Sequence, residues 1–433
     1  MPLTGIGGPI GRFSMAPCAA NGKKWSGISY RINRAEIGLR ATISSCQNSM
    51  QIHLTDSLTA YSVNKITFTP RLYNGRDSMN QTYILTIGLL LTTAAAQAQV
   101  DTVRASTLPP AQQAEKLYNS GVAKFNQKSY RAALQDFDKA LAAKPDFAKA
   151  YYNRAAVRYE LKEYPTAVQD YDQAIKLDPN TFTSYFGRAQ AREALKQPAE
   201  AEQDYGKAAE LKADYAPAWY YRGALRFEKA DYQAAKADFD AAIKADPTYA
   251  YAWHDRGSAQ RQLNNLPAAI QDYTQALKLQ PELLPALLNR AATRRRAGDL
   301  KGALQDYNDY LRQKQDNALA YTNRGAARYE QGDYKGAVDD FTKAIELDAQ
   351  YAFAWNNRAA AYLKLEDYKK AETDASKAIG LNAQYAEAYL NRGHAREMLR
   401  NPDAACQDWR KAAELGLEVG NTHAANSGCG TAE

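Results

Sequence analysis

A pattern of 34 residues repeats nine times between Ala114 and Val419, with no residue inserted or deleted. A fixed period of this length indicates a solenoid, in which each unit buries its apolar face only against its neighbours. We number positions 1 to 34 within a unit and interpret the chain by position. The nine units begin at Ala114, Ala148, Phe182, Ala216, Ala250, Leu284, Ala318, Ala352 and Ala386.

Small and large residues recur at fixed positions, which predicts two packed helices per unit. Two amphipathic stretches of about 13 residues are separated by a turn. Position 8 is Gly or Ala and position 20 is Ala in all nine units, whereas position 24 is aromatic in eight. Unit six carries Tyr310 instead of Ala at position 27 and Gln315 instead of a terminating Pro. We therefore expect unit six to open more readily than the others.

Proline follows the second stretch in four units, where it cannot continue a helix. These prolines are Pro145, Pro179, Pro247 and Pro281. Together with the small and aromatic positions, they make the unit resemble the tetratricopeptide repeat. The resemblance covers all nine units and implies an all-α fold, a right-handed superhelical α-solenoid of antiparallel helix pairs. It also implies a concave groove lined by the first helix of each unit.

The flanking segments differ from the array in pattern and charge. Residues 1–78 show no sustained period and hold nine Lys or Arg against three Asp or Glu. We expect an unstructured leader outside the natural product; the alternative is a basic targeting arm. Residues 99–113 read as a polar linker and residues 420–433 as a C-terminal tail. In residues 79–433 the basic residues exceed the acidic ones by only one, which argues against nucleic acid as a partner.

Residues 79–98 have the pattern of a secretory signal peptide. An apolar core from Tyr83 to Leu91 is followed by Ala96-Gln97-Ala98, an A-x-A cleavage pattern. This core is too short to span a bilayer as a helix, so we expect no membrane span in the mature chain. The prediction is an exported protein, periplasmic or extracellular. If the segment is an ordinary apolar stretch, the protein is cytoplasmic.

Two cysteines follow this cleavage site, Cys406 and Cys429. An oxidising compartment favours a disulfide between them, which would tie the tail to the last unit. In the alternative, Cys406 is a small core residue and Cys429 lies in a frayed tail.

Two charged positions recur along the array and suggest a structural ion-pair ladder. Position 23 is Asp in all nine units, and position 7 is Arg in every unit except the first, which has Ser120. We expect each Asp to pair with the Arg of the following unit, because Asp136 would otherwise lack a partner. The alternative is an Arg row that binds anionic ligands. The residues of the expected ladder are Asp136, Arg154, Asp170, Arg188, Asp204, Arg222, Asp238, Arg256, Asp272, Arg290, Asp306, Arg324, Asp340, Arg358, Asp374 and Arg392.

Polar and aromatic residues recur at positions that the resemblance places in the groove. An Asn side chain offers a donor and an acceptor to the amides of an extended peptide. The alternative is that these side chains bond neighbouring helices, and an aromatic stripe is equally suited to packing. Arg261, Arg294, Arg295 and Arg296 form a basic run that could meet an acidic segment. The candidate groove residues are Asn119, Asn153, Asn289, Asn323, Asn357 and Asn391, with Tyr118, Tyr152, Phe186 and Tyr220.

The sequence contains no catalytic motif, metal-ligand spacing or phosphate-binding Gly loop. We therefore expect no enzymatic activity, no cofactor and no bound metal. The leading hypothesis is a protein–protein interaction scaffold that binds extended peptide segments of other proteins in its groove. The alternative is a structural component of a cell-envelope assembly that uses outer helix faces or the ends of the array.

Overall fold

The computed structural model describes residues 28–29, 40–46, 49–55 and 108–429. The chain divides into two compact units, Met1–Thr93 and Ala94–Glu433. The expected signal peptide at 79–98, and the expected linker up to residue 107, lie outside the described residues. The same holds for residues 430–433.

The described residues of the first unit form three short antiparallel strands in the order β1-β2-β3. They are β1 (Ile28–Ser29), β2 (Arg40–Cys46) and β3 (Ser49–Thr55). The register pairs Ile43 of β2 with Ile28 of β1 and with Ile52 of β3. These strands lie within residues 1–78, the segment expected to be an unstructured leader. Their β-branched residues suit paired strands, a preference that a search for long periods does not detect.

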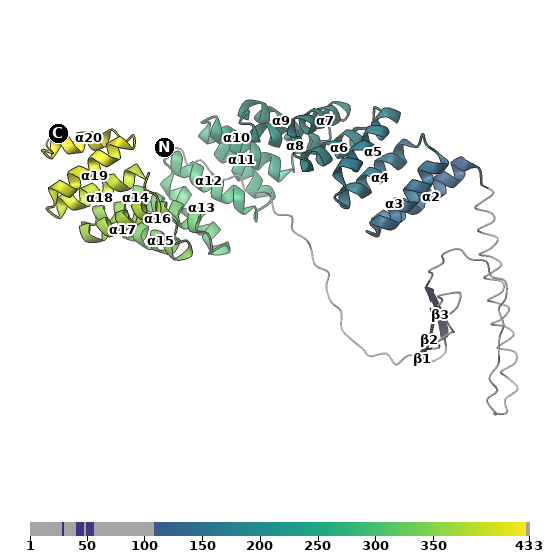
Figure 1. Cartoon of the computed structure of the whole chain (residues 1–433), viewed down its shortest axis with the longest axis horizontal. Coiled ribbons are helices and arrows are strands. Elements are labelled where there is room, and N and C mark those ends of the chain that lie inside the picture. The colour runs from purple at the N-terminus through teal and green to yellow at the C-terminus, as the bar shows by residue number, and fades with distance from the viewer. Residues whose placement is uncertain (1–27, 30–39, 47–48, 56–107, 430–433) are drawn as a thin grey trace. The chain divides into compact units, whose positions relative to one another are not determined.

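The described residues of the second unit form an array of nine helix pairs closed by one short helix (Figure 1). We call the two helices of each pair A and B. The A helices are α2 (Pro110–Asn126), α4 (Ala148–Glu160), α6 (Phe182–Ala194), α8 (Ala216–Glu228), α10 (Ala250–Gln262), α12 (Leu284–Arg296), α14 (Ala318–Gln331), α16 (Ala352–Lys364) and α18 (Ala386–Met398). The B helices are α3 (Tyr130–Ala143), α5 (Tyr164–Leu177), α7 (Pro198–Leu211), α9 (Tyr232–Ala245), α11 (Leu266–Leu279), α13 (Leu300–Gln313), α15 (Tyr334–Leu347), α17 (Tyr368–Leu381) and α19 (Pro402–Glu414). Helix α2 begins at Pro110, inside the expected linker, because Pro is well suited to a first helical turn.

The turn between the A and B helices has a left-handed residue at position 15 in all nine units. Only Gly298 and Gly332 are glycines there, while Ala230, for example, has φ of 61°. The following residue donates its amide five residues back, as Asp231 does to the Arg226 carbonyl at 3.0 Å. This Schellman arrangement reverses the chain within three residues.

The core of each helix pair is built from positions 8 and 24. At Gly121 an added Cβ would lie 2.7 Å from Phe137, and at Gly325 it would lie 2.7 Å from Phe341. Such distances leave no room for a side chain, so the aromatic ring of the B helix occupies the space beside the A helix. The Ala residues at position 20 are fully buried in all nine units. The packing therefore follows the repeated small and aromatic positions of the sequence.

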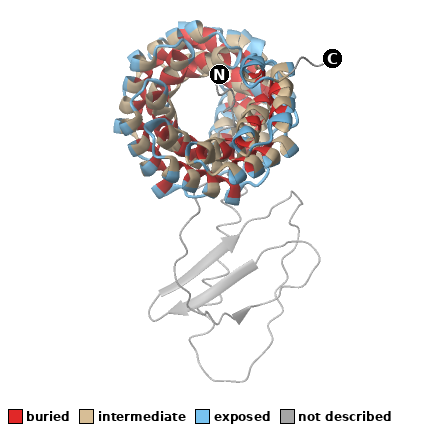
Figure 2. Ribbon diagram, turned by 90° about the vertical axis from the view of Figure 1, so that its left-hand side faces the viewer, coloured by how far each residue is buried: buried red, intermediate tan, exposed pale blue. Residues whose placement is uncertain are grey.

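The A helices of consecutive units contact each other through side chains at positions 5 and 6. In the view along the array, the helices form a ring with the exposed segments mainly at its outer rim (Figure 2). Close A-to-A approach places the A helices on the inner side of the curved stack. The fold is the all-α solenoid that the repeat predicts.

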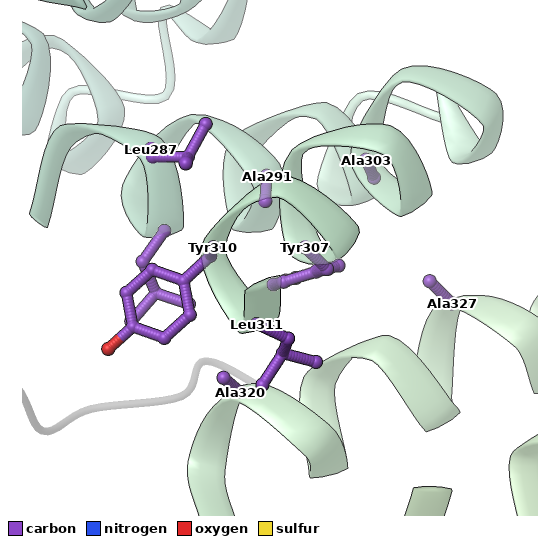
Figure 3. Packing of buried hydrophobic residues seen from close by; sticks show 9 residues of the cluster. Leu287, Ala291, Ala303, Tyr307, Tyr310, Leu311, Ala320 and Ala327 are labelled. Carbon is purple, nitrogen blue, oxygen red and sulfur yellow. The ribbon is translucent and has the colours of Figure 1, made fainter. Parts of the chain in front are cut away.

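Unit six accommodates its exceptional tyrosine inside the core (Figure 3). Tyr310 is 5% exposed and packs with Leu287, Leu311 and Ala320. Its hydroxyl accepts a hydrogen bond from Asn317 at 2.7 Å. The large side chain thus fills space between units six and seven, and the expected easier opening of this unit stays a prediction.

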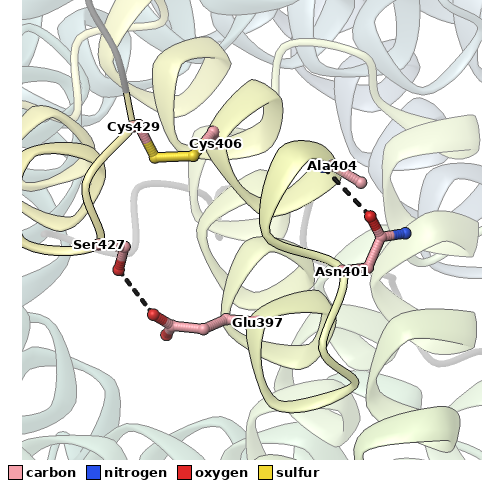
Figure 4. Close-up of a disulfide and its surroundings, with 6 residues drawn as sticks. All are labelled: Glu397, Asn401, Ala404, Cys406, Ser427 and Cys429. Atoms are coloured by element: carbon pink, nitrogen blue, oxygen red, sulfur yellow. Dashed lines mark hydrogen bonds between the residues drawn. A yellow bond between two sulfur atoms is a disulfide. The ribbon is translucent and has the colours of Figure 1, made fainter.

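A short helix, α20 (Val419–Asn426), covers the end of the array. A Cβ at Gly420 would lie 2.3 Å from the Trp409 carbonyl oxygen, so only glycine allows this approach. The structure joins Cys406 to Cys429, and Ser427 donates to Glu397 at 2.6 Å (Figure 4). The segment expected to be a tail is therefore a folded cap up to Cys429.

Candidate functional site

Each arginine at position 7 holds the buried aspartate at position 23 of its own unit. All eight arginines donate from Nε and Nη2 to the two carboxylate oxygens, at 2.6 to 3.0 Å. The nine aspartates expose at most 6% of their surface. These bidentate, charge-assisted bonds satisfy groups that would otherwise be costly to bury.

The expected pairing between units is therefore wrong, since Arg222 bonds Asp238 and not Asp204. Positions 7 and 23 are 16 residues apart, the spacing that also brings position 8 against position 24 within one helix pair. Asp136 of the first unit is not left without a partner. It accepts from Ser120 at 2.6 Å and from Lys124 at 2.6 Å.

The same arginines do connect neighbouring units, through a position that the sequence interpretation missed. Nη1 of Arg188 donates to Asp172 at 2.6 Å, and Asp172 occupies position 25 of the preceding unit. Aromatic side chains at position 4 flank the guanidinium groups, as Trp253 does for Arg256 at 4.6 Å. Burial alone would lower the pKa of Arg188, but its bonds to Asp204 and Asp172 raise it overall. Arg188 is therefore a charged link between two units.

A second basic residue, at position 11, was also missed. Arg158 donates to Asp170 at 2.7 Å, and Arg396 donates to Asp408 at 2.9 Å. Positions 7 and 11 lie one helical turn apart on one face, a spacing that could have revealed the pair. Unit eight has Tyr362 at position 11, and burial there raises the pKa of Asp374 despite its bond with Arg358.

The predicted asparagine row is partly used inside the array. Asn153 donates to the Tyr118 hydroxyl at 2.9 Å, and Asn391 donates to the Asn356 carbonyl oxygen at 2.8 Å. Asn289 contacts His254 at 3.0 Å. In each case position 6 of one unit meets position 5 of the unit before, so these three amides bond neighbouring helices.

The other three asparagines keep amides without a hydrogen-bond partner among residues 108–429. Asn119 is exposed in the first unit, which has no earlier neighbour. Position 5 of the preceding unit is Leu288 for Asn323 and Thr322 for Asn357. Asn323 is 8% exposed, and Asn357 is half-buried. Thr322 directs its hydroxyl to the Ala318 carbonyl and leaves Asn357 unpaired.

The four aromatic residues proposed for the groove mainly pack between helices. Tyr118 lies 5.0 Å from Phe147, and Tyr152 lies 5.9 Å from Tyr171, measured between ring centroids. Phe186 contacts Tyr205 at 5.4 Å. Tyr220 is 5% exposed and donates to Asp255 at 2.8 Å, so its assignment to an open groove is wrong.

More exposed aromatic residues lie at position 2, which the sequence interpretation did not single out. Phe353 is 46% exposed and Tyr251 is 39% exposed. Phe353 lies between Tyr351 and Tyr385, with centroids 5.7 and 5.1 Å away. Phe353 and Asn357 are one turn apart on α16 and share one helix face. We call these two residues the α16 pair.

The basic run of units five and six is mostly paired. Arg294 bonds Asp306 at 2.8 Å, Arg295 bonds Glu330 at 3.1 Å, and Arg296 donates to Asn264 at 2.8 Å. An acidic ligand would have to displace these contacts.

The fold and these contacts define the class: an α-solenoid in which helix pairs stack through repeated side-chain links. Family models described as Tetratricopeptide repeat match residues 148–181, 250–283 and 318–351, residues 182–215 and 216–249, and residues 341–373. The chain therefore contains tetratricopeptide repeats. Such arrays are scaffolds for protein–protein interaction. Within residues 108–429, no helix is long and apolar enough to cross a membrane.

The structure is similar to several solved structures of other proteins, three of which are compared with it below. A crystal structure of MamA is 25% identical over 38% of this chain and 96% of that chain, with a TM-score of 0.36. A tetratricopeptide repeat protein from Parabacteroides merdae is 18% identical over 57% of this chain and 98% of that chain, with a TM-score of 0.46. Yeast Tom70 is 16% identical over 73% of this chain and 96% of that chain, with a TM-score of 0.37. None of the curated proteins matches the chain.

Proposed function

We propose that the array binds an extended segment of another protein along its A helices. The observation that carries this proposal is the α16 pair. An exposed aromatic ring and an unpaired amide one turn apart offer an apolar contact and a hydrogen bond to a peptide backbone. Asn323 and Asn119 occupy position 6 in their own units, as Asn357 does in unit eight, and also keep amides unpaired among the described residues.

The contrast among the asparagines supports this assignment. Asn153, Asn289 and Asn391 bond neighbouring A helices, which accounts for their presence without a ligand. Asn357 has no such bond among the described residues, although its amide is half-buried. A ligand amide would satisfy it, because partly buried polar groups are costly when left unpaired.

Site-specific crosslinking tests the proposal directly. Benzoylphenylalanine replaces Phe353, and the purified chain is irradiated with an extract of its source cells. The control carries the same group at Leu177, which is 40% exposed at the end of a B helix. We expect a discrete adduct from position 353 that Asn357→Ala weakens about 2- to 10-fold, the value of one hydrogen bond. Equal adducts at both positions would contradict the proposal.

The alternative role, a structural component of an envelope assembly, uses other surfaces. Leu279 and Leu347 at the ends of B helices are 36% and 39% exposed, as an outer contact would need. Adducts from position 177 but not from 353 would favour this role.

We also propose that the protein is exported. The Ala96-Gln97-Ala98 pattern supports this location, and so does the Cys406–Cys429 bond, because disulfides persist in oxidising compartments. Alkylation with and without a reductant tests it on protein taken from its native source. A mass difference of two alkyl groups is expected, whereas identical masses would show free thiols.

A further inference from the structure

Seven of the eight junctions between units place an oxygen atom on Nη1 of the position-7 arginine. The oxygen comes from position 25 of the preceding unit, at 2.6 to 3.4 Å. The residue type varies, but an acceptor is always present. The seven residues are Asp138, Asp172, Asp240, Thr274, Asn308, Thr342 and Ser376.

The junction between units three and four has Gly206 at this position. Arg222 bonds Asp238 through Nε and Nη2, and Nη1 finds no acceptor among the described residues. A Cβ added to Gly206 would lie 3.1 Å from that Nη1. Gly206 therefore offers no side-chain acceptor to Nη1 of Arg222, which lies close to the Gly206 backbone.

A pocket of about 490 Å³ opens beside Gly206 and Arg222, between α7 and α8. Its lining includes Arg222, Arg226 and Lys229, with Glu202 and Gly206. Glu202 accepts from Arg226 at 2.8 Å and from Lys229 at 2.6 Å. Burial would raise the pKa of Glu202, but these two bonds lower it, so its carboxylate is fully engaged. Nη1 of Arg222 is one of the pocket's donors without an acceptor among the described residues, and it is the one that the other seven junctions pair with position 25.

We propose that this pocket binds a carboxylate, whose oxygen takes the place of the position-25 side chain on Arg222. Three of the seven natural occupants are aspartates, at 2.6 to 2.8 Å. A more highly charged anion such as phosphate would meet stronger repulsion than a carboxylate from Glu202 and Glu210, which line the pocket. The carboxylate is either a free small molecule or an Asp or Glu side chain of a partner protein.

The pocket is separate from the α16 pair. Position 7 points away from positions 2 and 6 of the same A helix, because each residue turns the helix by about 100°. The carboxylate site therefore does not rest on the proposed peptide-binding surface.

The test follows Arg222 in the full chain by NMR of labelled arginine side chains. Sodium acetate is titrated against sodium chloride at equal ionic strength. We expect acetate to shift the Arg222 guanidinium signal in a saturable manner, and chloride to have no such effect. Gly206→Asp should abolish the shift, since its carboxylate occupies the site, and Gly206→Asn provides a second, neutral occupant. The matched control is Gly380→Asp, a helical glycine with nothing within 4 Å of an added Cβ, which should keep the shift.

A second arm distinguishes the two sources of carboxylate. Acetyl-Gly-Asp-Gly-amide is compared with its Asn counterpart and with acetate. Tighter binding of the Asp peptide than of acetate by about tenfold or more supports a partner protein, and equal binding supports a free carboxylate. Absence of a saturable shift with both probes would overturn the proposal, as would an undiminished shift in Gly206→Asp and Gly206→Asn.

Discussion

Arg188 links two units of the array through one guanidinium group. Its Nη1 donates to Asp172 of the preceding unit at 2.6 Å, while Nε and Nη2 hold Asp204 of its own unit. The two carboxylates differ in environment, since the Asp204 side chain is 5% exposed and that of Asp172 is 45% exposed. The aspartate at position 23 therefore holds the two helices of one unit together, and the residue at position 25 contacts the next unit.

This difference predicts unequal costs of mutation. Asp204→Ala leaves Arg188 and Arg192 without their buried partner and should destabilise the array by about 3–5 kcal/mol. Asp172→Ala removes a solvent-screened contact and should cost about 0.2–1 kcal/mol. Urea unfolding of both variants measures the difference. Equal losses would mean that the link between units matters as much as the buried pair.

The left-handed residue at position 15 predicts a stabilising substitution. Ala230 has φ of 61°, a conformation that costs an L-residue about 1–2 kcal/mol and costs glycine far less. Ala230→Gly should therefore raise the free energy of unfolding by about 0.5–1 kcal/mol, after the extra entropy of glycine in the unfolded chain. Gly332→Ala is the reverse control and should lower it. Thermal unfolding checks both, and a loss of stability in Ala230→Gly would refute this interpretation of the turn.

The buried hydroxyl of Tyr307 has no hydrogen-bond partner among the residues that the structure describes. Tyr307→Phe should therefore leave stability unchanged or raise it by about 1 kcal/mol, because an unsatisfied polar group is removed. Tyr205, at the same position of unit three, donates to Glu193 at 2.9 Å. Tyr205→Phe should instead lose about 1 kcal/mol. If both variants lose the same amount, an unseen partner such as water satisfies Tyr307.

The C-terminal cap should weaken in acid. Burial lowers the pKa of His394 below its usual value of 6.5, and His423, 4.4 Å away between ring centroids, lowers it further, while Glu397 opposes the shift. The folded state disfavours the charged form of His394, so the neutral side chain contributes its full stability above the pKa of the unfolded state. That contribution is lost as the pH falls through the folded-state pKa of His394. Hydrogen exchange of α20 should accelerate more between pH 7.5 and 5.5 than intrinsic rates require. His394→Gln should remove that extra acceleration.

The repeated positions allowed most of the array to be predicted from sequence. Gly121 against Phe137 shows why: a small residue and an aromatic ring at fixed spacing define how two helices touch. The partner of Arg222 was predicted wrongly, because periodicity identifies charged positions but not the rotation of one helix against the next. Lys162 at φ of 64° was not foreseen either, since tertiary packing overrides the preference for glycine there.

The candidate site was only partly predictable. The sequence identified Asn357, but only coordinates distinguish it from Asn153, whose amide is used by Tyr118. Phe353 was missed because position 2 varies in residue type from unit to unit. The missing acceptor at Gly206 became meaningful only when the seven other junctions showed an acceptor at position 25.

Hydrogen–deuterium exchange of the chain with its crosslink-identified partner tests the central claim most directly. The account predicts slower exchange in α14, α16 and α18, with the B helices α15 and α17 unchanged. Protection confined to the B helices, or to α2 and α20 at the ends of the array, would contradict binding along the A helices and would support the envelope-assembly role.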